Sequence, residues 1–331
     1  MLKKTFILGK LWHFFVTLHP TSQYPGNIMK RFRHILQTII FIIPFVHTLL
    51  CCGNSHNQEK KHAAVQKQAK TLHIGTLPTI DCLPIFIMAE HQLIDTATAF
   101  VRLVPFLSQM DCDEAFRKGK INICASDVIR SEMMKRQGKR LKYITTTPAR
   151  WLLVAHRTTR AKNISHLKDR MIGMTRHSAT EMLTHHATDS AKLKNHQLFA
   201  IQINDVLLRL KMMNEKQIDA AWLPEPQATE AKQQGHIVLA DSRASDSHLG
   251  VLIATGHLDP SQEKAFVNAY NKACDSINQL GVNHYTHLIK KYCKVSEKTI
   301  KKIPAVTFYH ALQPDSQQIQ QFKTFLKQRQ P

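Results

Sequence analysis

The chain has 331 residues and carries 45 lysines and arginines against 24 aspartates and glutamates, a formal net charge of +21. The first 51 residues hold six of the basic residues and no acid, so the remainder carries +15. The basic residues are dispersed and no nucleic-acid-binding motif occurs, which argues against a nucleic-acid partner. We interpret the charge as solvated faces near a lipid surface, with a mild bias toward anionic ligands.

The N-terminal region has the pattern of an export signal. A basic start at residues 29–34 precedes an apolar run, residues 35–50, that is short for a permanent membrane span. Leu49-Leu50-Cys51-Cys52 resembles a bacterial lipobox, with Cys52 as the lipidated residue. We expect 1–28 to be an upstream extension outside the mature protein, 29–51 a lipoprotein signal peptide and 52–70 a flexible tether. An uncleaved N-terminal anchor is the alternative.

The cysteines after this signal do not suggest a disulfide framework. Five of them remain, an odd number, so they cannot all pair with one another. Burial as small apolar side chains is the default expectation. Cys274 and Cys293 lie on neighbouring predicted helices, and a bridge between these two stays open.

The first segment after the tether predicts a ligand platform. Residues 72–77 are typical of a buried strand, and Gly75 and Pro78 are turn signals. Asp81 can cap a following helix whose first turn contains Pro84. A strand that leads through a loop to a helix N-terminus directs backbone N–H groups and the helix dipole at a ligand.

Strand-like and helix-like segments then alternate along the chain, which predicts an α/β protein with parallel sheets covered by helices. After a strand at 249–255, almost only helices follow. Two polar turns, 156–162 and 241–247, bracket a central unit. We therefore expect residues 71–156 and 244–331 to form lobe 1 and residues 157–243 to form an inserted lobe 2.

Three segments, 75–93, 101–127 and 203–235, resemble the solute-binding lipoproteins of ABC importers, in the group for nitrate, sulfonates and thiamine-type pyrimidines. The motifs are GTLPTIDCLP, then AFRKGKINICASD, then IDAAWLPEP. The resemblance implies a periplasmic-binding-protein type II fold, with two α/β lobes joined by a two-crossover hinge. It also implies a monomer that captures a small-molecule solute outside the cytoplasm, works with an ABC permease of the inner membrane, and has neither a cofactor nor a catalytic role.

The resemblance further implies that four chain segments line the cleft between the lobes. These are Leu77, Pro78, Thr79, Asp81 and Cys82; Ala125, Ser126 and Asp127; Arg176, His177 and Ser178; and Trp222, Pro224 and Glu225. For Asp81 and Asp127, helix capping is the simpler role beside ligand contact. Trp222 is interpreted either as a core aromatic or as a stacking platform. The acids Asp81, Asp127 and Glu225 in one cleft fit a simple anion poorly, and a ligand with hydrogen-bond donors, such as an aminopyrimidine or an amide, is at least as compatible.

Other chemistry has little support in the sequence. The pairs His185-His186 and His284/His287 lack further ligands that would complete a metal site, so no metal is expected. No G-x-S-x-G, P-loop or H-E-x-x-H motif occurs. Two alternatives remain: an enzyme on the same scaffold, of the pyrimidine-synthase or menaquinone-pathway type, and a ligand-sensing receptor domain.

Overall fold

The computed structural model describes residues 70–194, 197–245 and 248–328, all of which belong to one compact unit, residues 67–331. The expected extension, signal peptide, lipidated Cys52 and most of the tether lie outside the described residues. Among the described helices, none is long and apolar enough to cross a membrane.

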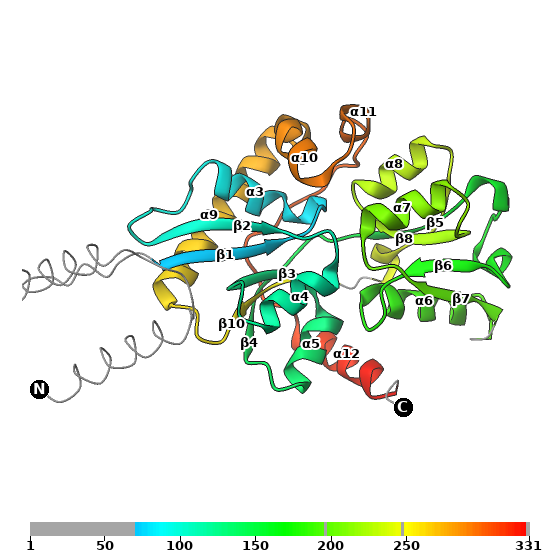
Figure 1. The fold of residues 1–331 in the computed structure, drawn as a ribbon, viewed down its shortest axis with the longest axis horizontal. Helices are drawn as coiled ribbons and strands as arrows, with labels where there is room; N and C mark the ends of the chain where they lie inside the picture. Colours follow the sequence, from blue (N-terminus) through cyan, green and yellow to red (C-terminus); the bar gives the residue numbers. More distant parts are fainter. Residues whose placement is uncertain (1–69, 195–196, 246–247, 329–331) are drawn as a thin grey trace, which may run out of the picture. The chain divides into compact units, whose positions relative to one another are not determined.

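The first of two five-stranded sheets (Figure 1) is built from both ends of this unit. Its order is β2 (Ala99–Pro105), β1 (Lys70–Thr76), β3 (Ile123–Asp127), β10 (Gly250–Thr255) and β4 (Leu141–Thr146). Strand β1 runs parallel to β2 and β3, whereas β10 runs antiparallel to β3 and β4. Gly75 in β1 is required by packing, because a Cβ there would lie 2.4 Å from Ile121 Cδ1 and 2.7 Å from Cys112 Sγ.

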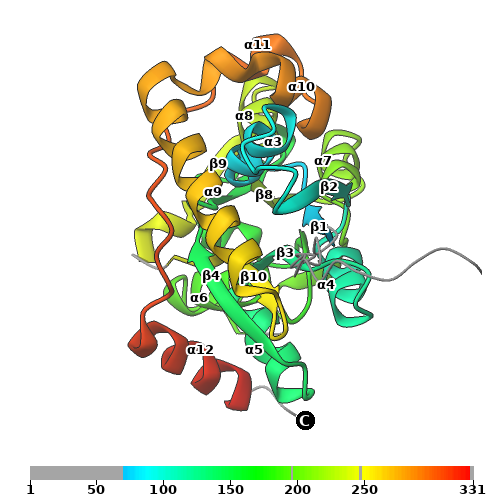
Figure 2. The ribbon, with the colours of Figure 1, turned by 90° about the vertical axis from the view of Figure 1, so that its left-hand side faces the viewer.

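Helices cover both faces of this sheet (Figures 1 and 2). One face packs against α3 (Leu83–Glu90), α9 (Pro260–Leu280) and α10 (Thr286–Cys293). The other packs against α4 (Gln109–Arg117), α5 (Val128–Arg136) and α12 (Ser316–Gln328). Helix α3 follows η1 (Ile80–Cys82), and its first six residues are all buried, so it is a core helix rather than an amphipathic one. We call this sheet and its helices the first lobe.

The second sheet lies in the central part of the chain. Its order is β7 (Phe199–Gln202), β6 (Met171–Met174), β8 (Ala220–Pro224), β5 (Trp151–Ala155) and β9 (Ile237–Asp241). Strand β6 runs parallel to β7 and β8, and β5 runs antiparallel to β8 and β9. Helix α6 (Ala179–Ser190) packs on one face, and α7 (Val206–Asn214) and α8 (Gln227–Gln233) pack on the other. This sheet and its helices are the second lobe.

Short 3-10 segments and one brief helix connect these elements. They are η2 (Arg157–Thr159), η3 (Ile164–Leu167), η5 (Ser242–Ser245), η6 (Val282–Tyr285) and α11 (Glu297–Ile300). The predicted fold class, α/β with two lobes, is confirmed. The chain passes from the first sheet to the second between β4 and β5 and returns between β9 and β10.

One expected lobe boundary differs from the sheet membership. The prediction placed residues up to 156 in lobe 1, but β5 pairs with β8 and β9 of the second sheet. The first crossing between the lobes therefore lies before Trp151. A strand's sequence shows that it is buried on both faces, and it does not show which neighbours it pairs with.

The five cysteines within the described residues are free and buried: Cys82, Cys112, Cys124, Cys274 and Cys293. The bridge considered for Cys274 and Cys293 is therefore not formed. Cys112 and Cys124 come within hydrogen-bonding distance, with their Sγ atoms 3.4 Å apart. The default expectation of small apolar core residues describes these side chains.

Candidate ligand-binding site

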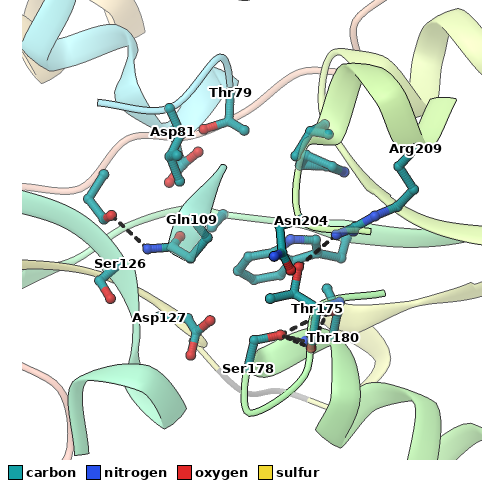
Figure 3. A pocket seen from close by; sticks show the side chains of 16 residues that line it. Thr79, Asp81, Gln109, Ser126, Asp127, Thr175, Ser178, Thr180, Asn204 and Arg209 are labelled. Atoms are coloured by element: carbon teal, nitrogen blue, oxygen red, sulfur yellow. Dashed lines mark hydrogen bonds between the residues drawn. The ribbon is translucent and has the colours of Figure 1, made fainter. Parts of the chain in front are cut away.

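A small cavity lies where the two lobes face each other (Figure 3). It has a volume of about 50 Å³. Both lobes and the connection between β4 and β5 contribute side chains to its wall. The lining residues are Leu77, Thr79, Asp81, Gln109, Ala125, Ser126, Asp127, Ala149, Trp151, Thr175, Ser178, Thr180, Asn204, Val206, Arg209 and Pro224.

Most of this wall is built at the carboxyl ends of strands. Strand β3 ends in Ser126 and Asp127 and leads directly into α5. Strand β6 ends just before Thr175, and α6 begins after its N-cap Ser178. In open α/β sheets ligands bind at this edge, where strand ends and helix N-termini converge. Each lobe therefore presents one such junction to the cavity.

Asp81 is a half-buried acid on the first-lobe side of the cavity. Thr147 Oγ1 donates a hydrogen bond to Asp81 Oδ2 at 3.0 Å. Burial raises the pKa of Asp81 above its ordinary value, against hydrogen bonds from Thr79 and Thr147 that lower it. The desolvation of this carboxylate is thus only partly offset within the protein.

Asp127 lies at the N-terminus of α5 and lines the cavity together with Ser178, the N-cap of α6. Its side chain caps α5, accepting a hydrogen bond at 2.9 Å from the backbone N–H of Arg130. Burial raises the pKa of Asp127 to about 6, while hydrogen bonds from the backbone of Arg130 and of Ala179 act in the opposite direction. Ala179 is the first residue of α6. The carboxylate of the first lobe thereby faces the helix N-terminus of the second lobe.

A second buried acid, Asp113 of α4, organises the polar side chains behind this wall. Asp113 Oδ1 accepts hydrogen bonds from Ser126 Oγ and Gln109 Nε2, each at 2.9 Å. Its other oxygen forms an ion pair with Arg130. Gln109 Nε2 also donates to the carbonyl oxygen of Ala125 at 3.0 Å. The donors of Ser126 and Gln109 are therefore used inside the first lobe.

Arg209 of α7 is a buried cation that serves the second lobe itself. Its side chain donates to the carbonyl oxygens of Ile203 and Trp222 and to Thr175 Oγ1, at 2.6 to 3.0 Å. The residue is 2% exposed. Desolvation lowers the pKa of Arg209 to about 10, which leaves it charged at neutral pH. The guanidinium joins β7, β8 and the loop after β6.

Hydrogen bonds join the lobes on more than one side of the cavity. The N–H of Ile80 donates to the carbonyl oxygen of Glu225 at 2.9 Å. Gln227 Nε2 donates to the carbonyl oxygen of Pro78 at 2.8 Å. A further contact between the lobes is the isolated antiparallel bridge of Ser108 and Asp205. The lobes are therefore in contact around the cavity, which is the arrangement of a closed conformation.

Six of the expected site residues line this cavity: Leu77, Thr79, Asp81, Ser126, Asp127 and Ser178. Ala125 and Pro224 do so as well. Figure 3 shows Asp81 and Asp127 on the first-lobe side and Ser178, Thr175 and Arg209 on the second-lobe side. The two acids are also bound within the protein, so capping and cavity lining coincide at Asp127.

The other expected site residues lie elsewhere. Cys82 and Trp222 are buried in the core, and Trp222 Nε1 donates to Thr184 Oγ1 at 2.9 Å. Arg176 and His177 are exposed and line a separate depression beside α6. These positions argue against Trp222 as a stacking platform in this conformation.

Pro78 and Glu225 belong to the interlobe contact rather than to the cavity wall. Their carbonyl oxygens accept the hydrogen bonds from Gln227 and Ile80. The carboxylate of Glu225 accepts a hydrogen bond from the backbone N–H of Thr229 at 3.0 Å. Glu225 also lines a neighbouring cavity of about 240 Å³ that includes Arg150. The expected third acid of the cleft thus does not line the cavity that Asp81 and Asp127 line.

Sequence reasoning missed several lining residues, and some had a usable signal. Thr175 follows β6, Asn204 follows β7, and Gln109 follows β2 at the start of α4. All three lie just beyond parallel strands, so the strand-end rule would have pointed to them. Arg209 lies within a helix and Trp151 begins a strand, and no local pattern distinguishes these two from structural residues.

No protein-family model and no curated protein sequence matches this chain. Solved structures do match, and they define the class of fold: the chain has the two-lobe fold of periplasmic solute-binding proteins.

One similar structure is the aliphatic sulphonate-binding protein of Escherichia coli, with a TM-score of 0.64 and 18% identity over 78% of this chain and 87% of that chain. Another is the nitrate-binding protein of Synechocystis PCC 6803, with a TM-score of 0.65 and 12% identity over 78% of this chain and 80% of that one. A third is the ligand-binding component of an ABC-type import system from Staphylococcus aureus, with a TM-score of 0.66 and 18% identity over 79% of this chain and 92% of that chain. The predicted resemblance is confirmed at the level of the fold.

These neighbours are transport binding proteins rather than enzymes. Among the described residues, no group of three or more His, Cys, Asp or Glu side chains is placed to hold a metal ion.

Proposed function

We propose that the protein is a solute-binding protein of an ABC importer, anchored outside the cytoplasm through a lipid on Cys52. It captures a small polar or planar solute between its lobes as a monomer and delivers the solute to a permease. The candidate solutes are sulfonate- and nitrate-type anions and thiamine-precursor pyrimidines, and a pyrimidine suits the acids of the cavity better.

The single observation that carries this proposal is the cavity between the two lobes. Strand ends and helix N-termini of two separate lobes meet around it, and hydrogen bonds such as Ile80 N–H to Glu225 O close its margin. A ligand that contacts both lobes stabilises such a closed state over an open one, which gives a ligand-shifted equilibrium. This arrangement explains capture and release without any chemical step.

Thermal unfolding of residues 67–331 in the presence of candidate solutes tests the proposal. Binding to the folded state raises the unfolding midpoint by mass action. We expect one class among pyrimidines, thiamine precursors, sulfonates, nitrate and amino acids to raise the midpoint and to be recovered unchanged. Conversion of the solute would instead favour an enzyme on this scaffold. The absence of a shift with every class would contradict solute capture.

The anchor and the transport partner need separate measurements. Labelling of the full chain with radioactive palmitate should be lost in Cys52→Ser and kept in Cys51→Ser. Co-purification with a permease, and stimulation of its ATPase by the solute-loaded protein, would support import. Association with a sensor kinase instead would support the receptor alternative.

A further inference from the structure

The charges that line the cavity have a marked imbalance. Among its described lining residues, the acids Asp81 and Asp127 face a single cation, Arg209. Arg209 is directed at acceptors of its own lobe, the oxygens of Ile203, Trp222 and Thr175. Its charge is therefore held by the protein, and the two carboxylates define the electrostatic character of the cavity.

The hydroxyl and amide donors of the wall are also largely used within the protein. Ser126 Oγ donates to Asp113, and Ser178 Oγ donates to the carbonyl oxygen of Thr175 at 2.6 Å. Gln109 Nε2 is shared between Asp113 and the carbonyl oxygen of Ala125. An oxyanion needs several donors directed at one point. Most donors of this wall already hydrogen-bond to acceptors within the protein, whereas the carboxylate acceptors remain at the cavity.

The N-terminus of α6 is the helix end that could bind an anion, and a carboxylate of the protein already lies beside it. The start of α6 faces the cavity through Ser178 and Thr180. Asp127 of the first lobe lines the same cavity, and the backbone of Ala179 in that first turn lowers the pKa of its carboxyl. A carboxylate of the protein thus takes the place that an anionic solute would take, and a second negative charge beside it would be repelled.

Asp81 differs from Asp127 because its side chain caps no helix, although it lies in η1 immediately before α3. It lies on the opposite part of the first-lobe wall, with its carboxylate directed at the cavity (Figure 3). The partners of this carboxylate are the hydroxyls of Thr147 and Thr79 and the backbone of Asp81 itself, and none of them is a cation. Neutral hydroxyls stabilise a buried carboxylate less than a cation does. A cationic solute would supply the missing charge.

We infer that the cavity selects a small cationic nitrogen group, an amine or amidinium, that donates hydrogen bonds to the Asp81 carboxylate. This inference rests on the proposed function of solute capture, and it specifies the class of solute. A metal ion fits the site less well, because no cluster of three or more ligating acids, His or Cys occurs among the described residues.

Matched probes of one shape and different charge test the inference on the full chain. The first set is acetamidine, acetamide and acetate, and the larger set is benzamidine, benzamide and benzoate. Nitrate, methanesulfonate and zinc chloride complete the panel. We expect the amidinium of at least one set to bind by calorimetry, and the amide and carboxylate of equal size to bind at least about tenfold more weakly.

Asp81→Asn separates charge from shape, because asparagine keeps an oxygen that can accept the hydrogen bond from Thr147. We expect this variant to lose amidinium affinity by about tenfold or more relative to the parent, while the amide retains its affinity. Asp111→Asn is the matched control, since Asp111 is an exposed acid of α4 outside the cavity wall. It should leave amidinium affinity unchanged. Should Asp81→Asn fail to fold, Asp81→Glu replaces it, and it should alter the preference between the two amidines.

The possible outcomes distinguish the inference from the function on which it rests. Binding of nitrate, methanesulfonate or a carboxylate without binding of an amidinium would overturn the solute class and leave solute capture standing. Binding of zinc alone would overturn it in favour of a metal site. If no probe of this set binds and no solute of the broader panel binds, both the solute class and the proposed solute capture are overturned. If Asp81→Asn and Asp111→Asn lose amidinium affinity equally, the loss comes from the change in net charge, and the role of Asp81 is rejected.

Discussion

The side-chain amide of Gln227, on the second lobe, donates a hydrogen bond across the lobe boundary to the carbonyl oxygen of Pro78 on the first lobe, at 2.8 Å. The same amide lies 3.4 Å from the carbonyl oxygen of Cys293. Gln227 is fully buried. One side chain of α8 therefore contacts two separate segments of the other lobe, and these contacts exist only when the lobes are together.

Replacement of Gln227 by alanine should weaken the closed state. The change removes a buried hydrogen bond and leaves the carbonyl oxygen of Pro78 without that donor, at a cost of roughly 1–3 kcal/mol. The amide of Ile80, which donates across the same boundary to Glu225, should then exchange its hydrogen roughly fivefold faster or more. Hydrogen exchange followed by mass spectrometry measures this, and Gln217→Ala, at an exposed position of the same lobe, is the control. Unchanged exchange at Ile80 would contradict this role of Gln227.

Arg209→Met should destabilise the protein strongly. The variant removes a buried guanidinium and leaves the carbonyl oxygens of Ile203 and Trp222 without those donors. Each buried acceptor without a partner costs roughly 1–3 kcal/mol, so we expect a loss of at least about 2 kcal/mol in the free energy of unfolding by urea. Arg209→Lys should recover little of the lost stability, because one ammonium group cannot reach all the acceptors that the planar guanidinium contacts.

Lys211→Met in the same helix is the control for Arg209, since Lys211 is exposed. It should change the free energy of unfolding by about 0.5 kcal/mol or less. A similar effect of the two methionine variants would show that the buried network contributes nothing beyond helix propensity.

The stability of the protein should depend on pH through Asp127. Burial raises the pKa of this carboxyl to about 6 from 3.8, so the folded protein binds the proton more tightly than the unfolded chain. Its contribution to stability is therefore fully present below about pH 4 and is lost as the pH rises through about 6. The charged groups around it are Arg130 of α5 and Asp113 of α4.

Urea unfolding of the parent and of Asp127→Asn between pH 4 and 7 isolates this effect. The stability of the parent relative to the variant should fall with pH across the window and level off above about pH 6. Subtraction of the two curves removes the groups that both proteins share. A relative stability that rises with pH would mean that Asp127 is stabilised as a carboxylate, contrary to the burial argument.

The two tryptophans of the described chain should respond differently to substitution. Trp222 is 1% exposed and its indole N–H is bonded to Thr184, so Trp222→Phe should cost about 2 kcal/mol of stability. Trp151 is half-buried at the cavity, so Trp151→Phe should cost less. Intrinsic fluorescence that changes on solute binding should disappear in Trp151→Phe and persist in Trp222→Phe. The opposite result would place the solute nearer the core of the second lobe.

The sequence predicted the path from β1 to α3 well, because local signals agree there. An apolar strand, Pro78 after it and a proline in the first helical turn all indicate the same local structure. Two details were wrong: Gly75 lies within β1 rather than in the turn, and Asp81 does not cap α3, whose N-cap is Cys82. Asp127 was likewise expected both as a cap and as a site residue; the cap is confirmed, and the side chain lines the cavity. The local sequence is sufficient to predict a helix cap where one side chain accepts the hydrogen bond from a free N–H at the helix N-terminus.

Features that depend on pairing between distant segments were not predictable. Strand β5 reads as a buried strand, and only its register with β8 assigns it to the second lobe. Trp222 and Trp151 are both aromatic residues in strands, and the choice between core and cavity depends on which helix covers each face. The sequence around Arg209 gives no indication of its role, because its acceptors belong to segments that only the fold brings together.

The insertion of the second lobe has a consequence for the order in which the molecule is made. Strand β10 lies between β3 and β4, so the first sheet lacks a central strand until residue 255 has left the ribosome or the export channel. The five strands of the second sheet lie consecutively between Trp151 and Asp241 and need nothing from outside that span to pair. Since domains fold as units when their chain is complete, we expect the middle of this polypeptide to reach its native structure first and the two flanking segments to close around it afterwards.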